Sequence, residues 1–165
     1  MSARVGGLVE RLHAAEIDLA DDFRTVGERH AADQDVFHLC HQLAEQCAAR
    51  AERLRSIAER FGTPLHEPTD KPTIDWLLSS ARRALSGLVA HRPETGLVLL
   101  RDLRQLYVAA EEIDFYWIML GQAAQALRDA ELLSAVDDMH KQLLTQVKWL
   151  KTRAKEAAPQ ALVAG

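Results

Sequence analysis

The chain has 165 residues, of which 48% are hydrophobic and 27% are charged, and its formal net charge at pH 7 is −4. This length suits one domain, residues 1–165, with a substantial core, while the slight acidity argues against a nucleic-acid surface, which needs a basic patch. The N-terminus lacks the apolar core of a signal peptide, and no run approaches the ~20 apolar residues of a membrane span. We therefore expect a cytoplasmic protein that binds neither nucleic acid nor membrane.

Apolar residues recur at helical spacing along almost the whole chain, and the alternation typical of strands is missing. We expect a first helix over residues 5–31 and a second over residues 34–61. Asp33 can cap the second helix, and Gly62 can end it. The short break between the two helices predicts that they run antiparallel.

A proline-containing loop follows, and it leads into a shorter helix expected over residues 74–90. Two more long helices are expected over residues 94–128 and 130–157, and the last residues should be frayed. The order is thus hairpin, long crossover, hairpin, with a crossover long enough to span the bundle. That topology is the one used by ferritin-like bundles with a single long connection, so we predict an all-α, ferritin-like four-helix bundle.

Polar side chains fall on the apolar faces of these helices when residues are placed at 100° steps. Burying an ionisable group is costly unless the group is paired, hydrogen-bonded or bound to a metal. All four long helices contribute to this set. The expected buried polar network comprises Glu16, Asp22, Gln46, Arg50, Tyr107, Asp114 and His140.

Two of these polar pairs are expected to meet across the core. In an antiparallel hairpin, positions equidistant from the turn lie side by side, which brings Glu16 level with Arg50. In the second hairpin, Asp114 lies within one helical turn of the level of His140. This is the geometry from which a carboxylate/histidine metal site is built, and it is equally the geometry of a buried ion-pair network.

Arg50 bears most strongly on the choice between these two interpretations. Asp137-x-x-His140 repeats the i, i+3 spacing of a ferritin-type Glu-x-x-His motif, with a shorter acidic side chain. A guanidinium near the centre, however, would repel a divalent cation and would neutralise Glu16 or Asp22 instead. We therefore expect a structural ion pair at Arg50.

A second group of histidines lies on the opposite side of the second helix. His38, His41 and Glu45 fall away from the apolar arc, which predicts a solvated surface cluster or an oligomer contact. Cys40 and Cys47 are seven residues apart, about 10.5 Å along one helix, which is too far for a disulfide. We expect them to be reduced packing residues.

Features of nucleophilic catalysis are missing, since no Ser/His/Asp or Cys/His pairing and no glycine-rich phosphate loop can be read. We assign no catalytic residue and do not expect an enzyme. Tyr116 and Trp149 lie away from the apolar arcs of their helices, and aromatic residues are favoured at interfaces. This favours a homodimer.

Three stretches of the chain carry a family resemblance: LHAAEIDLADDF, ARAERLRSIAERFG and EEIDFYWIMLGQAAQALRDAELL. Over roughly residues 8–155 they resemble the ferritin-like family of DUF892-type, stress-associated four-helix bundles. Members of that family show a Y-A-A-E-like stretch in the first helix, E-R-L before a helix-ending glycine in the second, and E-I-x-x-Y in the third.

The resemblance implies a ligand set that is only partly present here. Glu16 matches the carboxylate of the first helix, and Glu112 matches the glutamate of E-I-x-x-Y, although the helical wheel turns Asp114 inward instead. On the second helix Glu45 is the nearest carboxylate, and the positions matching paired glutamates on the fourth, residues 142–143, hold Gln and Leu. The ligand set is therefore eroded.

An intact di-iron site needs about four carboxylates and two histidines. We expect a degenerate metal centre in a structural, binding or stress-associated protein without a cofactor. One alternative is an iron or manganese protein that reacts with oxygen or peroxide. A second is a small-molecule or haem-binding bundle, with His140 as haem ligand. The ligands of the metal alternative would be Glu16, Glu112, Asp114, Asp137 and His140.

Overall fold

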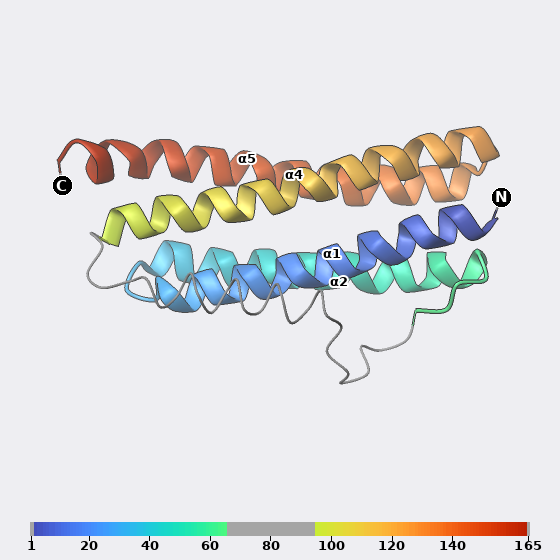
Figure 1. Cartoon of the computed structure of the whole chain (residues 1–165), viewed down its shortest axis with the longest axis horizontal. Coiled ribbons are helices and arrows are strands. Elements are labelled where there is room, and N and C mark those ends of the chain that lie inside the picture. The colour runs from blue at the N-terminus through green and yellow to red at the C-terminus, as the bar shows by residue number, and fades with distance from the viewer. Residues whose placement is uncertain (1, 66–94, 165) are drawn as a thin grey trace.

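The structure is a computed structural model that describes residues 2–65 and 95–164. These residues form four helices and no strand, which confirms the all-α class for this part of the chain (Figure 1). The expected helix over residues 74–90, and the crossover around it, lie outside the described residues. The helices are α1 (Ser2–Arg29), α2 (Gln34–Arg60), α4 (Thr95–Leu127) and α5 (Ala130–Leu162).

Local hydrogen bonds explain where the helices begin and end. Asp33 accepts a bond from the backbone N–H of Val36 at 3.2 Å, and Asp129 accepts one from Leu132 at 2.9 Å. Both aspartates are therefore N-caps that satisfy a free donor of the first helical turn. Gly62, with φ of +70°, follows the end of α2 in the left-handed conformation that glycine adopts without strain.

The C-terminal helix is longer than the sequence predicted, because α5 continues to Leu162 and its last turns are ordered rather than frayed. Pro159 lies close to the end of α5, where a missing N–H removes only one helical bond. Ala161 is 7% exposed, and a Cβ built on Gly96 would lie 2.8 Å from its Cβ. Close packing against the start of α4 therefore stabilises these last turns.

Contacts between the hairpins fix the directions of the helices. Glu16 contacts Trp117, whereas Arg29, further along α1, contacts Asp102, which lies earlier in α4. The helices α1 and α4 are therefore antiparallel, and ion pairs near both ends show the same for α2 and α5. It follows that α2 and α4 run in the same direction, so the end of α2 and the start of α4 lie at opposite ends of the bundle, which is about 50 Å long judged by the 33 residues of α4.

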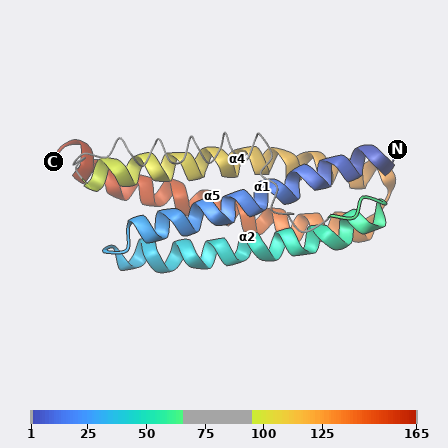
Figure 2. The same cartoon turned by 60° about the horizontal axis from the view of Figure 1, so that its bottom comes forward.

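The core lies between the two hairpins, α1–α2 and α4–α5, which pack against each other along their length (Figure 2). Its side chains are mainly leucine, alanine, valine and isoleucine from all four helices. Among residues 2–65 and 95–164, the largest fully buried side chain is Trp117, and the next largest is Arg50. No described helix combines the length and apolar character needed to cross a membrane. A charged residue thus occupies a central place in the core.

Candidate functional site

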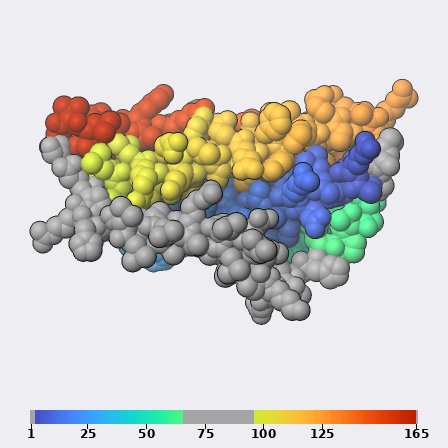
Figure 3. Space-filling model, in the orientation of Figure 1, coloured from blue at the N-terminus to red at the C-terminus, as the bar shows by residue number. Residues whose placement is uncertain are grey.

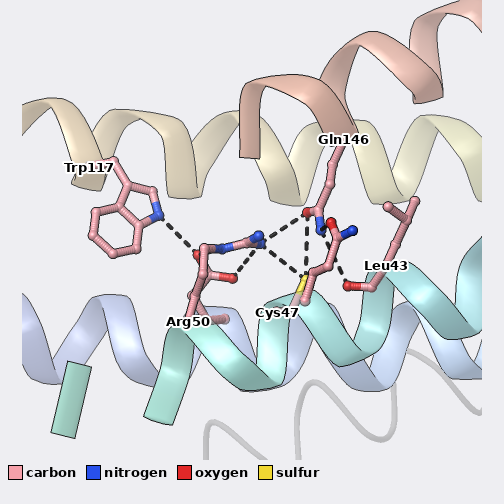
Figure 4. Close-up of polar contacts among 7 residues, drawn as sticks. Leu43, Cys47, Arg50, Trp117 and Gln146 are labelled. Carbon is pink, nitrogen blue, oxygen red and sulfur yellow. Dashed lines mark hydrogen bonds and ion pairs between the residues drawn. The ribbon is translucent and has the colours of Figure 1, made fainter. Parts of the chain in front are cut away.

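The buried ion pair between Glu16 and Arg50 is the centre of the candidate site (Figure 4). Arg50 Nε donates to Glu16 Oε1 and Arg50 Nη2 donates to Oε2, each at 2.8 Å. Glu16 is 0% exposed and Arg50 is 1% exposed. This two-pronged contact between α1 and α2 is the one expected from the hairpin register, and it is the strongest geometry available to a carboxylate.

The third helix adds a donor to the same carboxylate. The indole Nε1 of Trp117 donates to Glu16 Oε1 at 2.9 Å. Trp117 is fully buried, so its polar N–H needs a partner inside the core. Both carboxylate oxygens are therefore engaged, one of them twice.

The fourth helix contributes Gln146, which is 0% exposed. Its Oε1 accepts from Arg50 Nη2 at 3.0 Å, and its Nε2 donates to Gln46 Oε1 at 3.0 Å and to the carbonyl of Leu43 at 3.3 Å (Figure 4). The amide thus links the ion pair to the backbone and side chains of α2. Each of the four described helices supplies at least one polar group to this centre.

Cys47 lies beside the guanidinium on α2. Arg50 Nη2 donates to Cys47 Sγ at 3.2 Å, and the thiol donates to Gln146 Oε1 at 3.6 Å. Burial raises the pKa of the Cys47 thiol to about 12, although the charge of Arg50 opposes this. Burial alone would lower the pKa of Arg50, but the hydrogen bonds and charge of Glu16 hold it above its usual value. The cysteine is therefore a neutral thiol and the arginine a cation at neutral pH.

This centre does not fit a divalent metal. Its carboxylate is already bound by three donors, its thiol is protonated, and its other groups are a neutral amide and an indole N–H. Metal ligands must be deprotonated and have a free lone pair. In residues 2–65 and 95–164, no three His, Cys, Asp or Glu side chains come together as a metal site would require.

The second expected pair, Asp114 and His140, also forms, but at the rim of the bundle. His140 Nε2 lies 2.5 Å from Asp114 Oδ1, and the side chains of His140 and Asp114 are 22% and 20% exposed. The expectation that both are buried needs correction. Ile113, which is 1% exposed, takes the inward position on α4, and one residue along a helix turns the side chain by about 100°.

The remaining candidate metal ligands do not join this pair. Glu112 is exposed and accepts a hydrogen bond from the hydroxyl of Tyr116 at 3.2 Å, and Asp137 is exposed on α5. Neither Glu112 nor Asp114 therefore faces the centre of the core. Of the five candidate ligands, the structure brings together only Asp114 and His140, while Glu16 is held in the ion pair.

Two further members of the expected network are only half-buried. Asp22 lies on α1 beyond Glu16, and Tyr107 lies on the seam between α4 and α5. The Nζ of Lys151 lies 5.1 Å from the centroid of the Tyr107 ring, a cation–π contact at the surface. Gln46 is also half-buried, but its hydrogen bond to Gln146 makes it part of the centre.

The histidine cluster on α2 lies at the surface as expected, apart from His41, which is half-buried. His38 and Glu45 are exposed. His41 Nε2 lies 3.1 Å from Glu28 Oε1, and its Nδ1 lies 2.8 Å from the carbonyl of Phe37. Both ring nitrogens of His41 therefore have protein partners.

A second buried charge cluster was missed by the sequence reasoning. Asp102 is 0% exposed and contacts Arg29 at 2.7 Å, His30 at 2.9 Å and Arg101 at 3.1 Å. Burial would raise the pKa of Asp102, but the bonds from His30 and Arg29 lower it below its usual value. The sequence pattern does indicate that Asp102 is buried, because it lies three residues after Leu99, on the apolar arc of α4.

The burial of Gln146 is indicated by the same kind of spacing. It lies three residues after Leu143 and four before Leu150, both of which are buried positions of α5. That spacing places its amide on the apolar arc. A neutral amide on an apolar arc is a weaker indication of a buried polar site than a charged group, although Gln146 takes part in four hydrogen bonds.

Sequence comparisons add no family assignment: no protein-family model matches the chain, and no curated protein is significantly similar to it. The function must therefore be argued from the geometry of the site.

Proposed function

We propose that this chain is a ferritin-like bundle in which an arginine–glutamate ion pair replaces the metal centre, and that it acts as a non-catalytic structural or binding protein of the stress-associated type. The observation that carries the proposal is Arg50. Its cation lies where four helices direct polar side chains toward one another, which is where ferritin-like bundles build their carboxylate metal sites.

The position of the centre along the helices supports this interpretation. Glu16, Arg50, Trp117 and Gln146 each lie well inside their helix, away from both ends. The common direction of α2 and α4 also supports it, since a long return connection between the second and third long helices is characteristic of ferritin-like bundles.

The electrostatics of the centre oppose a catalytic role. The charges of one carboxylate and one guanidinium cancel, and both carboxylate oxygens already accept hydrogen bonds. A divalent cation would have to displace the guanidinium from its two bonds and would then be repelled by it. The centre therefore holds the helices together and does not perform oxygen or peroxide chemistry.

The same proposal includes a cytoplasmic homodimer. Cys40 and Cys47 are free thiols buried on α2, which suits a reducing compartment. The outward side of α4 exposes Val108, Phe115 and Ile118 at 53%, 62% and 44%. Exposed apolar side chains of this size are favoured at protein interfaces.

The test is elemental analysis of the protein after growth with added iron and manganese and after reconstitution of the purified chain with each metal. We expect far less than one metal ion per chain and no consumption of hydrogen peroxide above the buffer rate. The comparison variants are His140→Ala, which removes a candidate ligand, and Arg50→Met, which removes the competing cation.

Near-stoichiometric metal that is lost in His140→Ala would overturn the proposal and support the metal-binding alternative. A purified protein with visible haem absorbance, lost in the same variant, would support the haem-binding alternative. Metal bound by Arg50→Met but not by the parent chain would strengthen the proposal, because it would show that the guanidinium excludes the metal.

A further inference from the structure

A shallow groove lies on the seam between α4 and α5, separate from the buried ion pair. Its volume is about 270 Å³, and its floor is formed by Leu100, Leu103, Leu150 and Ala154. Leu103 and Leu150 are core residues at 1% exposure, so the floor is continuous with the hydrophobic core. At one end of the molecule, the C-terminal part of α5 (red) lies beside the first part of α4 (yellow) (Figure 3). The groove therefore offers apolar contact close to solvent.

The rim of this groove is cationic. Arg104, Lys151 and Lys155 line it together with the ring of Tyr107. Lys151 lies over the Tyr107 ring and 3.8 Å from the carboxylate of Glu111, so part of its charge is already compensated. Within the described chain, Arg104 and Lys155 make no ion pair with a carboxylate, and both are exposed. Two cations therefore remain available beside an apolar floor.

The charge at this seam differs from that of the chain as a whole. The protein is acidic, with a formal net charge of −4, yet residues 139–155 of α5 contain no Asp or Glu. The same stretch carries five cations, of which Lys151 and Lys155 line the groove and Arg153 is paired with Asp33; the other two are Lys141 and Lys148. A local positive field of this kind attracts anions and disfavours cations.

We propose that this groove binds a small amphiphile with one aliphatic chain and one anionic head, of the medium-chain carboxylate class. The chain would lie on the leucine floor, and the carboxylate would lie between Arg104 and Lys155. A guanidinium is suited to bind a carboxylate through two parallel hydrogen bonds. The volume is just below the ~300–1,000 Å³ typical of pockets for drug-sized ligands, which favours a short chain. This inference is independent of the function proposed for the ion pair.

Isothermal titration calorimetry with decanoate, below its micelle concentration, tests the proposal. We expect saturable binding of one decanoate per chain. Decylammonium, which has the same chain length and the opposite charge, should bind at least tenfold more weakly. Butyrate, which keeps the head but lacks most of the chain, should also bind at least tenfold more weakly.

Variants assign the binding to this groove. Arg104→Ala and Lys155→Ala should each weaken decanoate binding about tenfold, and Ala154→Phe, which fills the floor, should abolish it. The matched control is Lys141→Ala, because Lys141 lies ten residues before Lys151, about 15 Å along α5, and does not line the groove. Its affinity should be unchanged. Circular dichroism of each variant verifies that the helices remain folded.

Three results would overturn the proposal: no decanoate binding to the parent chain, equal binding of decanoate and decylammonium, or unchanged binding in both Arg104→Ala and Lys155→Ala. Sedimentation velocity tests whether a second copy of the chain, rather than a small amphiphile, occupies the groove. If Ala154→Phe changes the oligomeric state while the parent chain binds no decanoate, the groove is covered by a second copy of the chain.

Discussion

Replacing Arg50 with methionine is the most direct test of the buried ion pair. Methionine keeps much of the side-chain volume but removes the guanidinium, which leaves the indole of Trp117 as the remaining donor to Glu16 in the described part of the chain. The carboxylate then stays buried without a compensating charge. The variant therefore measures the cost of an unpaired charge rather than the cost of a cavity.

The size of the expected loss in the free energy of unfolding follows from the burial of the ion pair. Glu16 and Arg50 are 0% and 1% exposed, so water does not screen the pair in the folded state. Removing one partner of a fully buried pair lowers the free energy of unfolding by about 3–5 kcal/mol. With a urea m-value of about 2 kcal/mol/M, the unfolding midpoint should fall by about 1.5–2.5 M.

Urea unfolding followed by circular dichroism at pH 7 measures this change. The control is Arg53→Met, because Arg53 lies on the same helix and is exposed. It should change the free energy of unfolding by less than about 0.5 kcal/mol. Glu16→Gln alone should also be strongly destabilising, while the double variant should lose at least about 2 kcal/mol less than the sum of the two single variants. A loss below about 1 kcal/mol for Arg50→Met, or strict additivity, would refute the reasoning.

Three further predictions concern Trp117, Asp102 and the two buried cysteines. Trp117→Phe removes the indole N–H bonded to Glu16 and should lower the free energy of unfolding by about 1.5–3 kcal/mol in urea titrations. Asp102→Asn should lower the free energy of unfolding by about 2 kcal/mol at pH 7. Because the fold lowers the pKa of Asp102, the extra stability of the parent chain is complete above about pH 4 and is lost as the pH falls through the folded pKa. Urea titrations from pH 7 to pH 3 measure this difference. Because burial raises the pKa values of Cys40 and Cys47 to about 12, both thiols should react with a disulfide reagent at pH 8 far more slowly in the native protein than in urea.

The helices, and the pairing within each hairpin, could be predicted from the sequence because both depend on local information. Periodicity sets the helices, and Asp33 and Gly62 mark the limits of α2. Counting from a short turn then places Glu16 beside Arg50. The end of α5 was placed too early, because its last turns depend on packing between Ala161 and Gly96 across the hairpin.

The direction of individual side chains was harder to predict. A helical wheel assigns a face but cannot decide between neighbouring positions at the edge of an apolar arc. Asp114 and His140 lie at such edges, and the actual inward position of α4 belongs to Ile113. An error of this size moves the carboxylate of Asp114 from the core to the rim of the bundle, where its side chain is 20% exposed, and it changes the expected chemistry of that position.

Contacts between the two hairpins could not be predicted by counting residues from a turn. Their relative shift depends on side-chain packing and on a connection outside the described residues, so nothing in the local pattern places Trp117 beside Glu16 or Gln146 beside Arg50. Asp102 is a similar case, since its partners Arg29 and His30 lie on the other hairpin. The polar residues missed by the sequence are therefore the ones that join the hairpins.

This distribution of bonds explains what the buried ion pair contributes to the fold. A buried pair contributes little net stability compared with apolar residues of the same volume, because both charges lose their hydration. Its effect on specificity is different: Trp117 and Gln146 form hydrogen bonds with the pair only when α4 and α5 take this alignment against α1 and α2. Any other alignment leaves the ion pair intact within the α1–α2 hairpin but breaks these two bonds, at a cost of about 1–3 kcal/mol for each buried polar group left without a partner. The hydrogen bonds around the ion pair thus favour one register of the two hairpins.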